Sequence, residues 1–168
     1  MPIQADIEFA EVEIAPTLAV LVPGECSAEP SSITNAIAAA FDTLMGYVGR
    51  HGLIPIAPPR TIYTAYGEQH VEFRVAMPIL RPHPAPEAEP QAAIETIRGA
   101  KAYRFTHRGP YSRLMQTYGQ ITVFLKERGW LQSEADWEKY MPMWEEYLND
   151  PESTPEADLL TYIYLPIT

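Results

Sequence analysis

Val75-Ala76-Met77-Pro78-Ile79 and Ile163-Tyr164-Leu165-Pro166-Ile167 are two versions of one pattern, one in each half of the chain. Both are apolar runs with a proline as the next-to-last residue, as expected of a buried strand and its exit. Between them, residues 81–90 (RPHPAPEAEP) are rich in prolines, which cannot donate ladder hydrogen bonds and favour an extended linker. The sequence therefore predicts one domain, 1–168, made of internal modules 1–80 and 91–168 joined by the linker 81–90.

The elements expected before these endings also repeat. Alternating residues 7–12 and the aliphatic run 17–22, which stops at Pro23-Gly24, predict two strands, and 94–97 and 101–106 are their counterparts. A helix follows in each half, and two further strand candidates follow each helix. Because the order, the helices and the endings all repeat, we infer an α+β fold produced by duplication.

Both helices have recognisable ends. Ser31 or Ser32 is expected to cap the first, and Gly52 to follow its last turn. Pro110 suits the first turn of the second helix, and Gly129 its end. Each helix carries an apolar stripe that must lie on a sheet. The stripes are Ile33, Ile37, Ala40, Phe41, Leu44 and Val48 in the first helix, and Leu114, Tyr118, Ile121 and Leu125 in the second.

Composition excludes several classes of function. Twenty-two acidic against twelve basic residues give a net charge of −10, which disfavours direct nucleic-acid binding and suits either a cationic ligand or simple solubility. The start of the chain lacks a secretory signal and no long apolar run follows, so a cytoplasmic protein with no membrane association is expected. Cys26, the single cysteine, is interpreted as a packing residue.

Catalytic and metal signatures are also missing. The sequence has no glycine-rich phosphate loop, no His-Glu-x-x-His and no Gly-x-Ser-x-Gly pattern. The four histidines fall in different predicted elements, so no metal and no cofactor are expected.

Tyrosine and tryptophan are concentrated in the last third of the chain, more than a helix-on-sheet core requires. Rings with polar tips suit a cleft for flat organic molecules, although each single ring can equally be core. The residues are Tyr111, Tyr118, Trp130, Trp137, Tyr140, Trp144, Tyr147, Tyr162 and Tyr164.

Two adjacent acids lie in a predicted strand of this region. The period of two places Glu145 and Tyr147 on one face and Glu146 on the other, so only one acid can point into a cleft, and we choose Glu145. A carboxylate among rings attracts a cationic aromatic ligand or, with its pKa raised by burial, acts as a general acid or base; the alternative is a solvent-facing acid. Tyr63 occupies the corresponding place in the first half. Glu72 is expected to pair with Arg74 on its own strand face.

An ordered series of residues resembles the GyrI-like and AraC-type effector-binding family. It runs from His107-Arg108-Gly109-Pro110-Tyr111 through Gly129-Trp130 and residues 144–151 (WEEYLNDP) to residues 160–167 (LTYIYLPI). The resemblance implies duplicated strand-helix-strand-strand (SHS2-like) modules, an antiparallel sheet with two helices on one face, and ligand in a central groove. One departure is Tyr162, where many relatives have a glutamate, which weakens a strong preference for cations.

Relatives in this family sense drugs when fused to DNA-binding domains, and free-standing ones sequester toxins or hydrolyse cyclopropane-bearing genotoxins with a glutamate and a tyrosine. The resemblance therefore implies a stand-alone binder of small aromatic or amphipathic compounds, cationic ones among them, with no direct nucleic-acid contact. Two alternatives stay open, a hydrolase of such genotoxins that uses Glu145 and Tyr147, and a protein-interaction inhibitor such as a DNA gyrase modulator. The candidate ligand-binding residues are Tyr63, Tyr111, Trp144, Glu145, Tyr147 and Tyr162.

Overall fold

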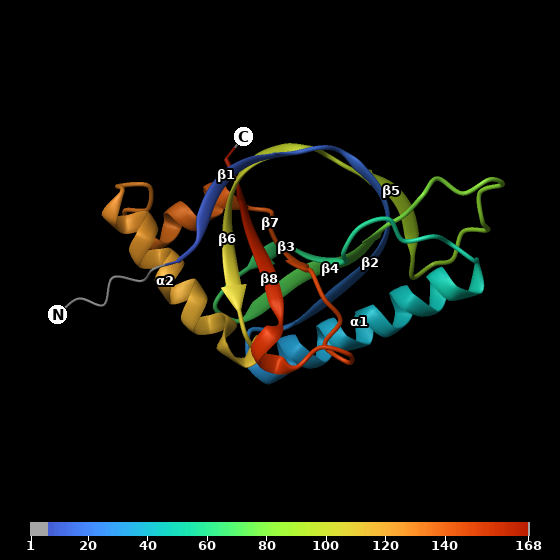
Figure 1. Ribbon diagram of the computed structural model, residues 1–168, viewed down its shortest axis with the longest axis horizontal. Coiled ribbons are helices and arrows are strands. Elements are labelled where there is room, and N and C mark those ends of the chain that lie inside the picture. Colours follow the sequence, from blue (N-terminus) through green and yellow to red (C-terminus); the bar gives the residue numbers. More distant parts are fainter. Residues whose placement is uncertain (1–6, 168) are drawn as a thin grey trace.

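The computed structural model describes residues 7–167, which form one curled sheet with two long helices (Figure 1). The strands pair antiparallel throughout, in the order β1-β6-β8-β7-β3-β4-β2-β5. The elements along the chain are β1 (Phe9–Ile14), β2 (Thr17–Ser27), α1 (Pro30–Arg50), β3 (Arg60–Tyr66), β4 (His70–Pro78), β5 (Ala93–Ile97), β6 (Ala100–Arg108), the 3-10 turn η1 (Tyr111–Arg113), α2 (Leu114–Glu127), the 3-10 turn η2 (Glu134–Tyr140), β7 (Met143–Tyr147), the 3-10 turn η3 (Glu156–Asp158) and β8 (Leu160–Pro166).

The helices cover one face of the sheet, and each has its own apolar core. Leu44 of α1 packs with Phe73 of β4, and Ile121 of α2 packs with Phe105 of β6. A third cluster, which includes Trp144 and residues of both edge strands, lies on the opposite face. The predicted class, α+β with an antiparallel sheet and both helices on one face, is confirmed.

The units β2-α1-β3-β4 and β6-α2-β7-β8 have the same order and meet where β3 pairs with β7. The remaining strands cross over, since β1 pairs with β6 of the second unit and β5 pairs with β2 of the first. The β1–β2 and β5–β6 connections therefore lie side by side. A Cβ at Gly99 would come within 2.6 Å of the carbonyl oxygen of Ile14, so the close approach requires a glycine there.

Strand β2 is longer than the sequence predicts. The expected stop at Pro23-Gly24 is wrong, because the strand continues to Ser27. β5 pairs with β2 only as far as Leu21, so Pro23 lies where one side of the strand is free and its missing N–H costs no ladder bond. Gly24 is needed because the Phe73 ring would lie 2.3 Å from a Cβ at that position.

The predicted helix ends are partly right. The first helix begins at Pro30, and its N-cap is Glu29, whose side chain makes no capping hydrogen bond. The predicted serine cap is therefore wrong, because Ser31 and Ser32 both lie inside the helix. Pro110 precedes η1 instead of lying in the first turn, and α2 begins only at Leu114. Gly52 and Gly129 both have the positive φ expected after a helix end. None of the helices in the described residues has the length and apolar content to cross a membrane.

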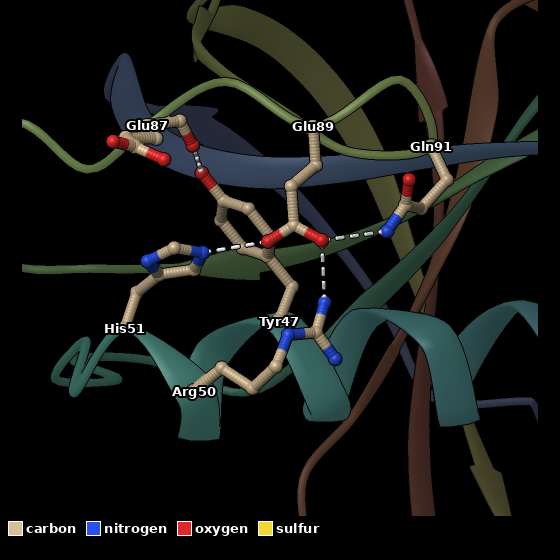
Figure 2. Close-up of polar contacts among 6 residues, drawn as sticks. All are labelled: Tyr47, Arg50, His51, Glu87, Glu89 and Gln91. Carbon is tan, nitrogen blue, oxygen red and sulfur yellow. Dashed lines mark hydrogen bonds and ion pairs between the residues drawn. The ribbon is translucent and has the colours of Figure 1, made fainter.

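The proline-rich linker is held against the end of α1 (Figure 2). The Glu89 carboxylate accepts a hydrogen bond from Arg50 Nη2 at 2.7 Å and lies 2.6 Å from His51 Nε2. The Tyr47 hydroxyl donates to the carbonyl of Glu87 at 3.3 Å. These contacts give the linker a defined path in spite of its composition.

Candidate functional site

Strand β7 lies in the middle of the sheet and sends alternate side chains to opposite faces. Glu145 contacts Tyr118 of α2 and is therefore on the helix-covered face. Glu146 contacts Tyr164 and Arg60 on the other face. The two adjacent acids thus have separate surroundings.

Glu145 is at the centre of a group of phenols from three elements. Tyr147 of the same strand donates to Oε1 at 2.8 Å, and Tyr63 of β3 approaches the same oxygen at 3.4 Å. Tyr118 donates to Oε2 from α2. The Tyr147 hydroxyl also lies 2.8 Å from Oγ1 of Thr61, the residue that faces Glu145 across the β3–β7 pair. Both units of the fold therefore contribute to the surroundings of one carboxylate.

Burial dominates the electrostatics of this group. Glu145 is only 3% exposed. Loss of hydration raises its pKa, and the hydrogen bonds from Tyr118, Tyr147 and Tyr63 oppose that shift, as does the nearby His107. Burial and the Glu145 charge raise the pKa of all three tyrosines well above the usual value, so their hydroxyls remain protonated donors.

His107 connects the group to the start of α2. It is buried, with Nε2 2.9 Å from the Pro110 carbonyl and Nδ1 2.6 Å from Oγ1 of Thr117. A carbonyl oxygen can only accept, so Nε2 carries the proton of that bond. The histidine thereby ties β6 to the turn that leads into the helix bearing Tyr118.

Aromatic rings from both helical regions surround Tyr147. Phe41 of α1 meets it edge-on with ring centroids 5.9 Å apart, and Tyr111 of η1 does so at 5.5 Å. Tyr66 packs edge-on against Tyr63 at 5.8 Å and is itself exposed. Phe41 and Tyr111 are only partly buried, so they lie between Tyr147 and solvent.

The structure places the six candidate residues in two groups. Tyr63, Glu145 and Tyr147 lie together with Tyr111 beside them, whereas Trp144 and Tyr162 are on the opposite face. The physical reason is the strand period, which turns neighbours of an inward residue to the other side.

Trp144 and Tyr162 instead border a separate polar cluster. Trp144 stacks on Tyr164 with centroids 4.9 Å apart, and the Arg104 guanidinium lies 4.3 Å from the centre of the Tyr162 ring. Nearby, Glu146 accepts a hydrogen bond from the Tyr164 hydroxyl at 3.0 Å and lies 3.9 Å from Arg60 Nε. Burial lowers the pKa of Arg60, and the Glu146 charge opposes that shift.

Sequence reasoning missed several members of the Glu145 group. Tyr118 belongs to the set of rings that suits a cleft and to the apolar stripe of its helix, but it is not among the six candidate ligand-binding residues, and only its hydroxyl distinguishes it from core. Phe41 was assigned to the stripe of α1. Thr61 and His107 lie on strands, and only the pairing of β3 with β7 and the packing of α2 reveal their contacts.

Glu145 belongs to no group of three closely spaced metal-ligating side chains within the described residues. Within residues 7–167 one group of three such side chains has closely spaced ligand atoms, and it consists of Glu25, His70 and Glu72 on β2 and β4. The predicted pairing of Glu72 with Arg74 is wrong: Glu72 lies 3.5 Å from His70, and Arg74 pairs with Glu95 at 3.4 Å.

Several solved structures are similar to this chain in fold. The C-terminal domain of EcmrR is similar with a TM-score of 0.72 and 18% identity, over 96% of this chain and 97% of that one. SAV2435 bound to tetraphenylphosphonium has a TM-score of 0.60 and 12% identity, over 97% and 94%. A hydrolase encoded by lin2189 from Listeria innocua has a TM-score of 0.56 and 12% identity, over 95% and 91%.

At these identities the structural likeness establishes the fold alone. No curated protein sequence matches the chain. The sequence does match the family model described as the GyrI-like small molecule binding domain, over residues 8–168. That match covers nearly the whole chain, and the protein therefore belongs to the GyrI-like family of small-molecule-binding domains.

Proposed function

We propose that this protein binds aromatic organic compounds, preferentially lipophilic cations, at Glu145. One observation carries the proposal: a carboxylate 3% exposed accepts hydrogen bonds from neutral phenols and takes part in no ion pair with a lysine or arginine within the described residues. Such a group is costly to ionise without a counter-charge. A cation supplied by a ligand removes that cost.

The surrounding rings favour a delocalised charge over a compact one. Phe41, Tyr111 and Tyr147 offer apolar faces and edges, and aromatic faces attract cations at a strength of about 0.5–2 kcal/mol. A large organic cation also loses little hydration when it is buried. The tetraphenylphosphonium bound to SAV2435, a protein of the same fold, is a ligand of this class.

Access to Glu145 requires movement of its cover. The carboxylate is buried and contacts Tyr118 and Tyr147, and the partly exposed rings of Phe41 and Tyr111 pack on Tyr147. We infer that the ligand displaces these two rings and stacks against the tyrosines beneath. Binding then exchanges ring–ring contacts within the protein for ring–ligand contacts of similar area.

The test compares tetraphenylphosphonium with triphenylphosphine oxide, a neutral compound of related shape, by calorimetric titration of the wild type and Glu145→Gln. We expect the substitution to weaken cation binding by about tenfold or more, or about 1.4 kcal/mol, and to leave the neutral compound nearly unchanged. Glu152→Gln is the matched control, because it removes one exposed negative charge that has no part in the Glu145 group. Equal cation affinity in all three proteins would contradict the proposal.

A hydrolytic activity is the second candidate, and the contact of Glu145 with Tyr147 favours it. The Glu145 carboxylate, with its raised pKa, can take a proton from water as the water oxygen bonds to a ring carbon and the ring C–C bond breaks. The phenol of Tyr147, 2.8 Å away, protonates the released carbon and regains its proton from Glu145. Incubation with a cyclopropane-bearing electrophile, followed by mass spectrometry, detects the ring-opened water adduct. The activity requires more adduct than buffer produces, and loss of that excess in Glu145→Gln.

A further inference from the structure

A second group of polar side chains lies on the sheet face away from the helices, at the ends of β2 and β4. Glu25 and Glu72 are direct register partners, and His70 precedes Glu72 by two residues. Val71 and Phe73, which alternate with them, point into the core beneath α1. The three polar side chains therefore project from the same face, opposite to that of Glu145.

The distances within this group are compatible with three ligands of one metal ion. His70 Nε2 lies 3.6 Å from an oxygen of Glu25 and 3.5 Å from an oxygen of Glu72. Good hydrogen bonds between such groups are about 2.7–3.2 Å long. A tetrahedral zinc ion with bonds of about 2.0–2.1 Å holds its ligand atoms about 3.3–3.4 Å apart. The ligand atoms of all three residues lie within 4.8 Å of one another, so small rotamer changes complete the arrangement.

The charges favour a cation at this position. Like charges directly opposite each other on paired strands are destabilising, and here two carboxylates are opposed. Arg74, two residues beyond Glu72, has its ion pair with Glu95. A bound divalent cation removes the repulsion between Glu25 and Glu72 directly.

The site is open to solvent and borders a hollow. The side chains of Glu25, His70 and Glu72 are 71%, 54% and 50% exposed, so a hydrated ion reaches them without a conformational change. Glu25 and Glu72 also line an open hollow of about 440 Å³, whose wall includes Thr64, and which offers room for a water molecule or small ligand on the metal.

We propose that Glu25, His70 and Glu72 form a binding site for a divalent transition-metal ion, with zinc as the type ion and a fourth coordination position facing the hollow. One imidazole nitrogen with two carboxylates suits zinc, nickel or cobalt, whereas magnesium and calcium prefer oxygen ligands only. This departs from the sequence-based expectation of no metal, because the register of β2 and β4 brings together residues far apart in the chain.

Calorimetric titration of the metal-free full chain with zinc chloride tests the proposal. We expect one saturable site, which His70→Gln and Glu72→Gln each weaken by about tenfold or more. Glu68→Gln is the matched control, because it removes one exposed negative charge from the same hairpin without touching a ligand. An excess of magnesium is expected not to compete.

Cobalt provides a second readout that a merely electrostatic attraction would not give. Four-coordinate cobalt absorbs visible light far more strongly than the hydrated ion, so the wild type and Glu68→Gln are expected to develop colour and His70→Gln is not. Three results overturn the proposal: no saturable zinc binding, equal weakening by Glu68→Gln and Glu72→Gln, or binding that survives His70→Gln. Thermal unfolding of each variant shows that its fold is intact.

Discussion

Glu145 and Glu146 are neighbours in the chain and differ in almost every physical respect. Glu145 has only neutral hydroxyl donors, and burial raises its pKa. Glu146 lies beside the buried Arg60 and accepts a hydrogen bond from Tyr164. The face of the strand, more than residue type, determines whether a carboxylate is already neutralised by the protein or remains available for a ligand's charge.

The largest effect is expected from Glu146→Ala. Arg60 then stays buried without its counter-charge, which is expected to lower the free energy of unfolding by about 3 kcal/mol. Glu145→Gln leaves no charge unpaired, so it is expected to lower the free energy of unfolding far less. Urea denaturation of both variants measures the contrast.

The double variant Arg60→Met/Glu146→Leu is the control for that contrast. Replacing a buried ion pair by apolar groups of similar size is often neutral, so most of the lost stability should return. If the double variant is as unstable as Glu146→Ala, the unpaired charge of Arg60 is not the cause of the lost stability.

A smaller effect concerns pH. Because the folded state raises the pKa of Glu145 above its ordinary 4.5, folding favours the protonated acid. The wild type is thus most stable relative to Glu145→Gln below that ordinary value, and loses the advantage as pH rises through the raised pKa. Denaturation of both proteins across acidic and neutral pH measures the difference, and a difference that grows with pH contradicts the assigned shift.

Removing the hydroxyl of one of these tyrosines is expected to change the free energy of unfolding by about 1 kcal/mol. Tyr118→Phe deletes a hydrogen bond that lowers the pKa of Glu145, so the pH midpoint at which the stability difference between the wild type and Glu145→Gln changes should move upward. Tyr164→Phe, which removes the hydroxyl bonded to Glu146, should leave that midpoint in place. A midpoint that moves equally in both variants would place the titration elsewhere.

The smallest effect is expected at the linker, where the pKa of the carboxylate is lowered and stability therefore depends on pH in the opposite direction. The His51 and Arg50 contacts lower the pKa of Glu89, so its stabilising contribution is present above the ordinary pKa and is lost as pH falls through the lowered one. Glu89→Gln should therefore lower the melting temperature slightly at neutral pH and not in strong acid. Calorimetric melts at the two pH values test this, with Glu87→Gln as control, since Glu87 contacts Tyr47 only through its backbone.

The strand and helix patterns of the sequence predicted much of the molecule, because these elements depend on residues close together in the chain. The strand period separated Glu145 from Glu146, helix periodicity identified the stripes of α1 and α2, and Gly52 and Gly129 marked their ends. The same local reasoning failed at Pro23, where tolerance of a proline depends on how far β5 extends along β2.

The sequence by itself determined the α+β class, the repeated order of elements and the opposite faces of Glu145 and Glu146, since these follow from periodicity and chain breaks. Only the tertiary structure decided that β1 and β5 cross to the opposite units, that Tyr63 and Tyr118 meet at Glu145, and that His70 lies between two glutamates. Those contacts join residues distant in the chain, and strand register and helix docking, which no local pattern encodes, bring them together.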